Sequence, residues 1–75
     1  MVKYTIKSNP AGQYYFPKEI REALGKEVVV IPNAFAAAIF PKDAPLERVA
    51  KSLELILEDI KLRLEHQNDS EKGGS

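Results

Sequence analysis

One stretch of the sequence decides the fold: Gly12-Gln13-Tyr14-Tyr15-Phe16-Pro17-Lys18-Glu19-Ile20-Arg21-Glu22-Ala23-Leu24-Gly25. Its aromatic residues 14–16 favour a half-buried strand. Pro17 then suits the first turn of a helix, because its φ is fixed and it has no N–H to leave unpaired. Gly25 can end that helix in the left-handed conformation. The stretch therefore predicts a strand, a very short helix and a stop.

The short helix after Pro17 has an apolar side and a charged side. Three apolar residues at i, i+3 and i+4 share one side: Ile20, Ala23 and Leu24. Three charged residues are left for the outer side: Lys18, Arg21 and Glu22. We therefore expect a helix that is set between strands and turns its charged side outward.

Strand patterns lie on both sides of this stretch. Residues 2–7 alternate apolar with polar side chains, which predicts a half-buried strand, and residues 8–12 have the composition of a loop. Residues 27–31 are largely β-branched and predict a buried strand. Residues 35–40 lie between two prolines and are too short for a stable helix, so they predict another strand. A tight turn at residues 32–34 should join the last two strands into a hairpin.

The chain is too small to bury a full core alone. A domain of 75 residues buries only about 60 % of the surface that its unfolded chain exposes. Short strands with free edges and one helical turn cannot close a core within one chain. Cysteine is absent, which excludes disulfides and thiolate metal sites. Oligomerisation is the remaining source of stability, so we expect an α+β fold that a second copy completes.

The stretch from Gly12 to Gly25, with a strand before it and two after it, resembles the core signature of the AbrB/SpoVT swapped-hairpin family of small DNA-binding domains. Such domains also form the DNA-binding half of MazE/VapB-type antitoxins. The resemblance covers residues 3–42. It implies an interleaved dimeric β-barrel with four short strands and one short helix per chain. It also implies a transcriptional regulator that binds double-stranded DNA as a homodimer and uses no cofactor.

The resemblance further implies which residues face DNA. Lys7 matches a basic position at the end of the first strand, and Gln13 matches the polar residue after the motif glycine. Lys18 and Arg21 match positions on the short helix, while Asn9 lies in the loop that would approach the groove. Lysine and arginine would mainly hold phosphates, whereas asparagine, glutamine and arginine can also read base edges. The alternative is that these are ordinary solvent-facing side chains of a small barrel.

The charges are balanced overall but not along the chain. The formal net charge is zero, with 11 Lys and Arg against 11 Asp and Glu. Up to residue 42 the balance is six against three, a net charge of +3, and from residue 43 it is five against eight, a net charge of −3. In a dimer the basic part would reach about +6. This split either marks a DNA-facing side or is the ordinary unevenness of a small protein.

A different kind of segment begins after residue 42. Apolar residues recur there at spacings of four, three, four, three and four: Leu46, Ala50, Leu53, Leu57, Ile60 and Leu64. With Asp43 as N-cap and Pro45 in the first turn, this predicts an amphipathic helix over residues 44–65, about 33 Å long. Leu55 and Leu62 form a second apolar strip. The helix either docks on its own chain, pairs with other copies in a dimer or tetramer, or binds a partner protein as an antitoxin would.

Together with the resemblance, the sequence predicts an AbrB/SpoVT-like swapped-hairpin domain at 1–42 and an amphipathic C-terminal helix for dimerisation or partner binding at 43–66. It predicts a disordered polar tail at 67–75. No run approaches the roughly 18 apolar residues of a membrane span, and the N-terminus lacks the apolar run of a signal peptide. We therefore expect a cytoplasmic protein.

Residues suited to catalysis are sparse. The single histidine, His66, lies at the end of the long helix, where an interaction with the terminal carbonyls explains it better than a role as a base. The carboxylates of that helix are better explained as a solvated side than as a metal cluster. No phosphate-binding loop or nucleophile motif occurs. We expect neither an enzyme nor a metal site.

Overall fold

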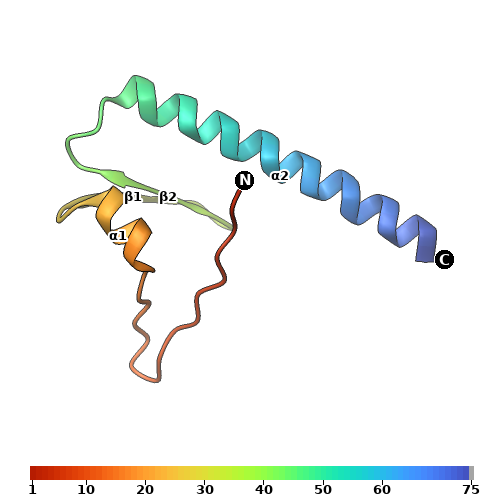
Figure 1. The fold of residues 1–75 in the computed structure, drawn as a ribbon, viewed down its shortest axis with the longest axis horizontal. Coiled ribbons are helices and arrows are strands. Elements are labelled where there is room, and N and C mark those ends of the chain that lie inside the picture. Colours follow the sequence, from red (N-terminus) through yellow and green to blue (C-terminus); the bar gives the residue numbers. More distant parts are fainter. Residues whose placement is uncertain (75) are drawn as a thin grey trace. The chain divides into compact units, whose positions relative to one another are not determined.

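The computed structural model describes residues 1–74, with side chains described as far as Gln67. The chain divides into two compact units, Val2–Ala44 and Pro45–Ser75, the second of which includes Met1. The first unit contains the short helix α1 and the strands β1 and β2, and the second contains the long helix α2 (Figure 1). The fold is therefore α+β, with one antiparallel sheet of two strands in the described part of the chain.

Helix α1 spans Lys18–Leu24 and so begins one residue after Pro17, which we predicted to lie in its first turn. Pro17 precedes it, and its carbonyl accepts hydrogen bonds from the N–H groups of Ile20 and Arg21, both at 3.0 Å. Proline loses nothing there, because an N–H at this point would have no partner within the helix. Ile20 and Leu24 are half-buried, as predicted for the apolar side, whereas Ala23 is exposed.

Gly25 ends α1, but not in the left-handed helical conformation that we predicted. Its φ of 78° is positive as expected, while its ψ is −160°. This combination is reached almost only by glycine. The Gly25 N–H donates to the carbonyl of Arg21 at 3.0 Å, so the last turn is closed while the chain leaves in an extended direction.

The predicted hairpin is present. Strand β1 spans Val28–Pro32, strand β2 spans Ala37–Pro41, and the two pair antiparallel with Val30 opposite Ile39. The connection is longer than the predicted three-residue turn. It covers residues 33–36, closed by the Asn33 N–H donating to the Ala36 carbonyl at 2.7 Å, so β2 begins two residues later than predicted.

The hairpin is apolar on both faces. On one face Val29, Ala38 and Phe40 are half-buried, and β2 contacts α1. On the other face Val30 and Ile39 remain 52 % and 38 % exposed. No residue of the described chain is buried. A two-stranded sheet of this kind is marginal alone, because its second apolar face stays in water.

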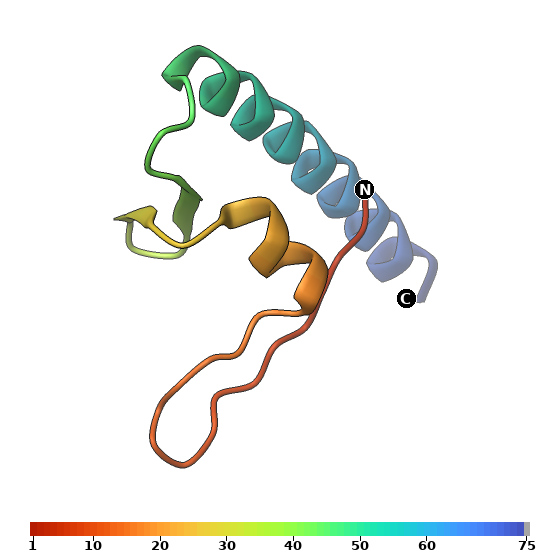
Figure 2. The same ribbon diagram turned by 60° about the vertical axis from the view of Figure 1, so that its left-hand side comes forward.

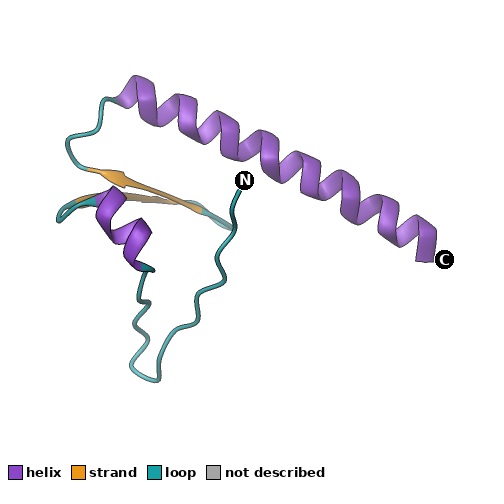
Figure 3. Cartoon of the chain, viewed as in Figure 1, coloured by secondary structure: helices purple, strands orange, loops and turns teal. Residues whose placement is uncertain are grey.

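Residues 2–7 and 14–16, predicted as strands, form no ladder in the single chain. They belong to two extended arms that precede α1, are drawn as loop in Figure 3 and are joined by a turn near Asn9 (Figure 2). Beyond the turn, no backbone hydrogen bond links the two arms in the part of the chain that the structure describes. A strand exists only by pairing, so the four-strand prediction requires a partner that the single chain does not supply.

Helix α2 spans Leu46–Gly74. It starts after Pro45, whose carbonyl accepts from the N–H groups of Arg48 and Val49 at 3.0 and 3.1 Å, so the prediction of Asp43 as N-cap is wrong. The helix also continues beyond the predicted end at residue 65, through most of the segment predicted as disordered. Extending a helix costs far less than starting one, which explains the continuation. Residue 75 lies outside the described residues.

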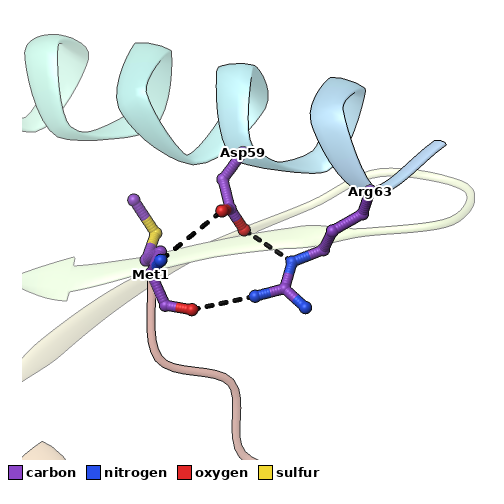
Figure 4. A network of polar contacts seen from close by, with 3 residues as sticks. All are labelled: Met1, Asp59 and Arg63. Atoms are coloured by element: carbon purple, nitrogen blue, oxygen red, sulfur yellow. Dashed lines mark hydrogen bonds and ion pairs between the residues drawn. The ribbon is translucent and has the colours of Figure 1, made fainter. Parts of the chain in front are cut away.

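Charged side chains interact along α2. Arg63 Nε donates to Asp59 Oδ2 at 2.7 Å, and Arg63 also donates to the carbonyl of Met1 at 2.8 Å (Figure 4). The amino group of Met1 lies 3.6 Å from Asp59 Oδ1. The hydrogen bond from Arg63 is the main reason why the pKa of the Asp59 carboxyl is held below its ordinary value. The positive charges of Arg63 and the Met1 amino group lower this pKa further, and desolvation opposes them. Within residues 1–74, no helix is long and apolar enough to cross a membrane.

Candidate nucleic-acid interface

The turn between the two arms has a defined geometry. Its four residues are Asn9, Pro10, Ala11 and Gly12, and the Gly12 N–H donates to the Asn9 carbonyl at 2.9 Å. Asparagine first, proline second and glycine fourth are the preferences of a type I β-turn. Gly12 has a φ of 81°, which glycine adopts without strain. The predicted loop is therefore a tight turn.

The side chain of Asn9 closes this turn. Its Oδ1 accepts hydrogen bonds from the N–H groups of Ala11 and Gln13, at 3.0 and 2.9 Å. Its Nδ2 donates to Gln13 Oε1 at 3.0 Å, and the Asn9 N–H donates to the Gln13 carbonyl at 2.9 Å. Both oxygen lone pairs of the Asn9 amide are thus used. Asn9 positions the turn, and what it can still offer a ligand is one N–H of Nδ2.

Gln13 is fixed in the same network. Its Oε1 accepts from Asn9 and also from the hydroxyl of Tyr15, at 2.9 Å. Within the described side chains, its Nε2 amide has no hydrogen bond. The exposed end of Gln13 is therefore a donor. Donors match the purine N7 and guanine O6 acceptors of the major groove, so this turn could contact a base edge.

Tyr15 also belongs to this site, although it is not among the residues predicted for it. Residues two apart in an extended arm point to the same side, and this places the Tyr15 hydroxyl beside Gln13. This alternation of side chains along an extended segment is the sequence pattern that could have identified Tyr15. The phenol donates to the amide oxygen and so fixes which end of Gln13 faces outward.

The two predicted residues of α1 differ in their surroundings. Lys18 Nζ lies 3.8 Å from Glu22 Oε1, and both side chains are well exposed, so this ion pair is weak. Arg21 is exposed and makes no ion pair with any described side chain. Lys18 and Arg21 are both exposed, as predicted. Lys18 lies opposite the half-buried side that Ile20 and Leu24 form, whereas Arg21 lies at the flank of that side.

Lys7 lies on the first arm, two residues before Asn9, and is exposed. Lys7, Asn9 and Gln13 therefore gather around the turn, while Lys18 and Arg21 lie on α1. Among the described residues no hydrogen bond or ion pair joins the two groups, and the turn lies at the opposite end of the arms from α1 (Figure 2). One chain thus carries two separate polar sites.

Two other lysines of this unit lie beside a shallow hollow after α1. It is lined by Leu24, Gly25, Lys26, Glu27, Lys42 and Asp43. Lys42 Nζ is 3.5 Å from Glu27 Oε2, and the four charged residues of the lining cancel. A hollow without net positive charge does not favour phosphate, so these lysines add nothing to the candidate interface.

All six seam residues predicted for the long helix lie in α2, and all are exposed. Their larger members range in exposed fraction from 40 % at Leu53 to 72 % at Leu46. Leu55 and Leu62, on the other side of the helix, are also exposed. The residues that the structure describes contain no cluster of three or more groups able to hold a metal ion.

Comparison with known proteins adds no further identification. A scan against protein-family models, a search of curated proteins and a search of solved structures each found no significant match to this chain.

Proposed function

We propose that this chain is a homodimeric DNA-binding protein that acts as a transcriptional regulator in the cytoplasm, as its resemblance to the AbrB/SpoVT family implies. The proposal has two parts, a dimer and a DNA-facing surface. The observation that supports it best is the exposed pair Lys18 and Arg21 on a helix whose other side packs inward.

The dimer is supported by the lack of burial. The chain exposes 6971 Å². A compact monomer of its mass, 8.4 kDa, would expose about 4,600 Å², which leaves an excess of about 2,400 Å². For two chains the excess is about 4,800 Å², and obligate dimers bury about 2,000 to 5,000 Å² over both partners, so an interface at the upper end of that class would supply the missing burial. A second hairpin would add strands by pairing with the backbone of the arms, and it would cover the exposed face with Val30 and Ile39, giving a barrel of four strands from each chain.

The DNA-facing surface follows from the two polar sites. Lys18 and Arg21 supply positive charge for phosphates, and Lys7 adds charge beside the turn. The donor ends of Asn9 and Gln13 are candidates for base contacts. A two-fold dimer would present each site twice, which suits a duplex with two half-sites. Few cations per chain predict modest affinity and a shallow dependence on salt.

The test is binding of a fluorescent DNA duplex of about 30 base pairs, measured by anisotropy across a salt series. Arg21→Ala should weaken binding most, because Arg21 has no ion pair among the described residues. Since a dimer carries the residue twice, this variant should also reduce the salt slope by about two. Glu22→Gln should strengthen binding, because it removes a carboxylate beside Lys18. Lys51→Ala on α2 removes the same charge from a residue outside the candidate interface and should leave binding unchanged.

Two results would contradict the proposal. One is absence of binding by the native chain at low salt. The other is an equal loss in Arg21→Ala and Lys51→Ala, which would mean that only overall charge matters. A Glu22→Gln variant that binds more weakly would show that the carboxylate positions Lys18 and does not oppose the phosphates.

A second candidate function is a protein-interaction module, such as an antitoxin whose C-terminal helix covers its partner. Leu55 and Leu62 favour it, since they are 48 % and 56 % exposed on the side of α2 away from the seam. If this strip stays exposed in the assembled protein, it requires a partner. Binding of an apolar dye that is lost in a Leu55→Lys, Leu62→Lys variant would support this function. Equal dye binding by both proteins would remove its basis.

A further inference from the structure

One face of α2 carries a continuous series of exposed apolar side chains within the part of the helix whose side chains are described. Eight residues form it, and we call it the α2 seam face: Leu46, Val49, Ala50, Leu53, Ile56, Leu57, Ile60 and Leu64. At 100° per residue they lie within an arc of about 120°, and they extend for about 27 Å along the helix. The large side chains of this face remain 40 to 72 % exposed, except Val49, which is half-buried.

We propose that the α2 seam face binds α2 of a second copy of this chain in antiparallel orientation, with the two-fold axis at the level of Leu55. In this register, positions whose numbers sum to 110 face each other. Leu46 meets Leu64, Ala50 meets Ile60, and Leu53 meets Leu57, each pair occurring twice. The pairing is isologous, as expected for a symmetric dimer.

Side-chain volume favours this orientation over a parallel one. In the antiparallel register the small Ala50 lies opposite the large Ile60, so small and large residues alternate across the pair. In a parallel pair in register, Ala50 would lie opposite Ala50 and Ile60 opposite Ile60. The alanine layer would then leave a cavity next to well-filled layers, and cavities of this kind are destabilising.

Charge also favours the antiparallel orientation. Glu47 and Lys61 flank the same edge of the α2 seam face and are 14 positions apart. Antiparallel pairing brings Glu47 of one copy beside Lys61 of the other at two symmetric places. It also brings the two Glu54 residues together once, at the centre, which is a single like-charge contact. Parallel pairing would set Glu54 beside Val49 and Lys61 beside Ile56, with no opposite charge. Unlike charges at such flanking positions specify helix orientation.

This inference is independent of DNA binding, because no residue of the α2 seam face belongs to the candidate interface. It can be tested directly because the chain has no cysteine of its own. Two variants of the full chain, Leu46→Cys and Leu64→Cys, are mixed in a glutathione redox buffer, and the disulfides are identified by mass. A Leu62→Cys variant, on the far side of α2, measures random collision.

The expected product is the mixed disulfide between positions 46 and 64. The like pairs 46–46 and 64–64 should not form, because antiparallel pairing separates them by about 27 Å, whereas a disulfide needs Cα atoms about 4.4 to 6.8 Å apart. Predominant like pairs would show parallel pairing and overturn the proposal. Disulfide yields no higher than those of Leu62→Cys would also overturn it, since the face would then not bind a second copy.

A charge exchange provides a second measurement in the same cysteine background. Glu47→Lys alone should lower the equilibrium constant for the mixed disulfide by about 5- to 20-fold, since two ion pairs become repulsive. Adding Lys61→Glu should recover part of the loss. Positions 47 and 61 are about 21 Å apart within one helix, too far to couple there, so recovery can arise only between chains. A double variant weaker than Glu47→Lys alone would overturn the antiparallel register.

Discussion

Asn9 and Gln13 are joined by three hydrogen bonds across the turn between the arms. The turn is thus ordered by its own side chains before any ligand is present. Both residues are in the candidate interface, yet their roles differ, because Asn9 uses its oxygen to hold the turn while Gln13 keeps its donor end outward. Pre-ordering of a contact loop reduces the entropy lost on binding.

Replacing Asn9 separates the role of its oxygen from that of its nitrogen. Asn9→Ala removes the acceptor for the N–H groups of Ala11 and Gln13, so those two amides should exchange with solvent roughly tenfold faster, as expected for the loss of modest hydrogen bonds. Asn9→Asp keeps the acceptor, so the exchange rates of both amides should stay close to those of the native chain. Amide hydrogen exchange followed by NMR measures both. Equal acceleration in the two variants would mean that the Nδ2 donor, not the oxygen, holds the turn.

Replacing Gly25 by any other residue is predicted to lower the free energy of unfolding. Its φ of 78° and ψ of −160° lie in a region that other residues enter at a cost of about 1 to 3 kcal/mol. A Cβ there would meet no atom within 4 Å, so the cost of Gly25→Ala comes from the backbone alone. Gly25→Asn should be no better than alanine, because asparagine is favoured at the left-handed helical ψ and not at this one. Unfolding in urea measures the free energy, and a clear rescue by asparagine would contradict the observed ψ.

Val30 tests the proposed dimer. It lies opposite Ile39 on the exposed apolar face of the hairpin. In an isolated chain Val30→Asp should cost little, since the site is 52 % exposed, whereas in a dimer it would bury an unpaired carboxylate and abolish association. The measurement is sedimentation equilibrium with Leu53→Lys in both proteins, so that the α2 seam face cannot pair. It should find the chain with native Val30 dimeric and the Val30→Asp variant monomeric. Val30→Thr retains the branched shape and should remain dimeric. A Val30→Asp variant that still dimerises would place the interface elsewhere.

The elements governed by local chemistry could be predicted from the sequence. Pro17 and Pro45 come directly before the two helices, because proline offers a carbonyl to the first turn and needs no partner for an N–H. The β-branched residues 28–31 form β1 as expected. The ψ of Gly25 could not be predicted, because a glycine signals positive φ without specifying ψ. The helical conformation at the end of α2 was not predicted, because the polar composition of this segment alone indicates disorder. A helix that has already formed extends into such a segment at little cost.

The residues of the candidate site could be proposed from their types, but the contacts among them could not be predicted. Helical spacing alone places Lys18 opposite Ile20 and Leu24 on α1, whereas it places Arg21 at the flank, about 60° around the helix from Leu24. The bond from Asn9 to Gln13 depends on the path of the turn, which residue preferences do not determine. The strands at 2–7 and 14–16 depend on a partner for their backbone groups, so their pairing stays a prediction of the dimer.

Asp59 links the stability of α2 to pH. Its hydrogen bond from Arg63, four positions later, is the main reason why the pKa of its carboxyl is lowered from 3.8. A pKa lower in the folded than in the unfolded chain stabilises the fold above the unfolded value, and this contribution is lost as the pH falls through the folded value. Thermal stability of α2, followed by circular dichroism, should therefore decline below about pH 4. NMR titration should find the midpoint of Asp59 below 3.8 in the native chain and closer to it in Arg63→Gln. An unchanged midpoint in that variant would assign the shift to the Met1 amino group instead, which lies 3.6 Å from the same carboxylate.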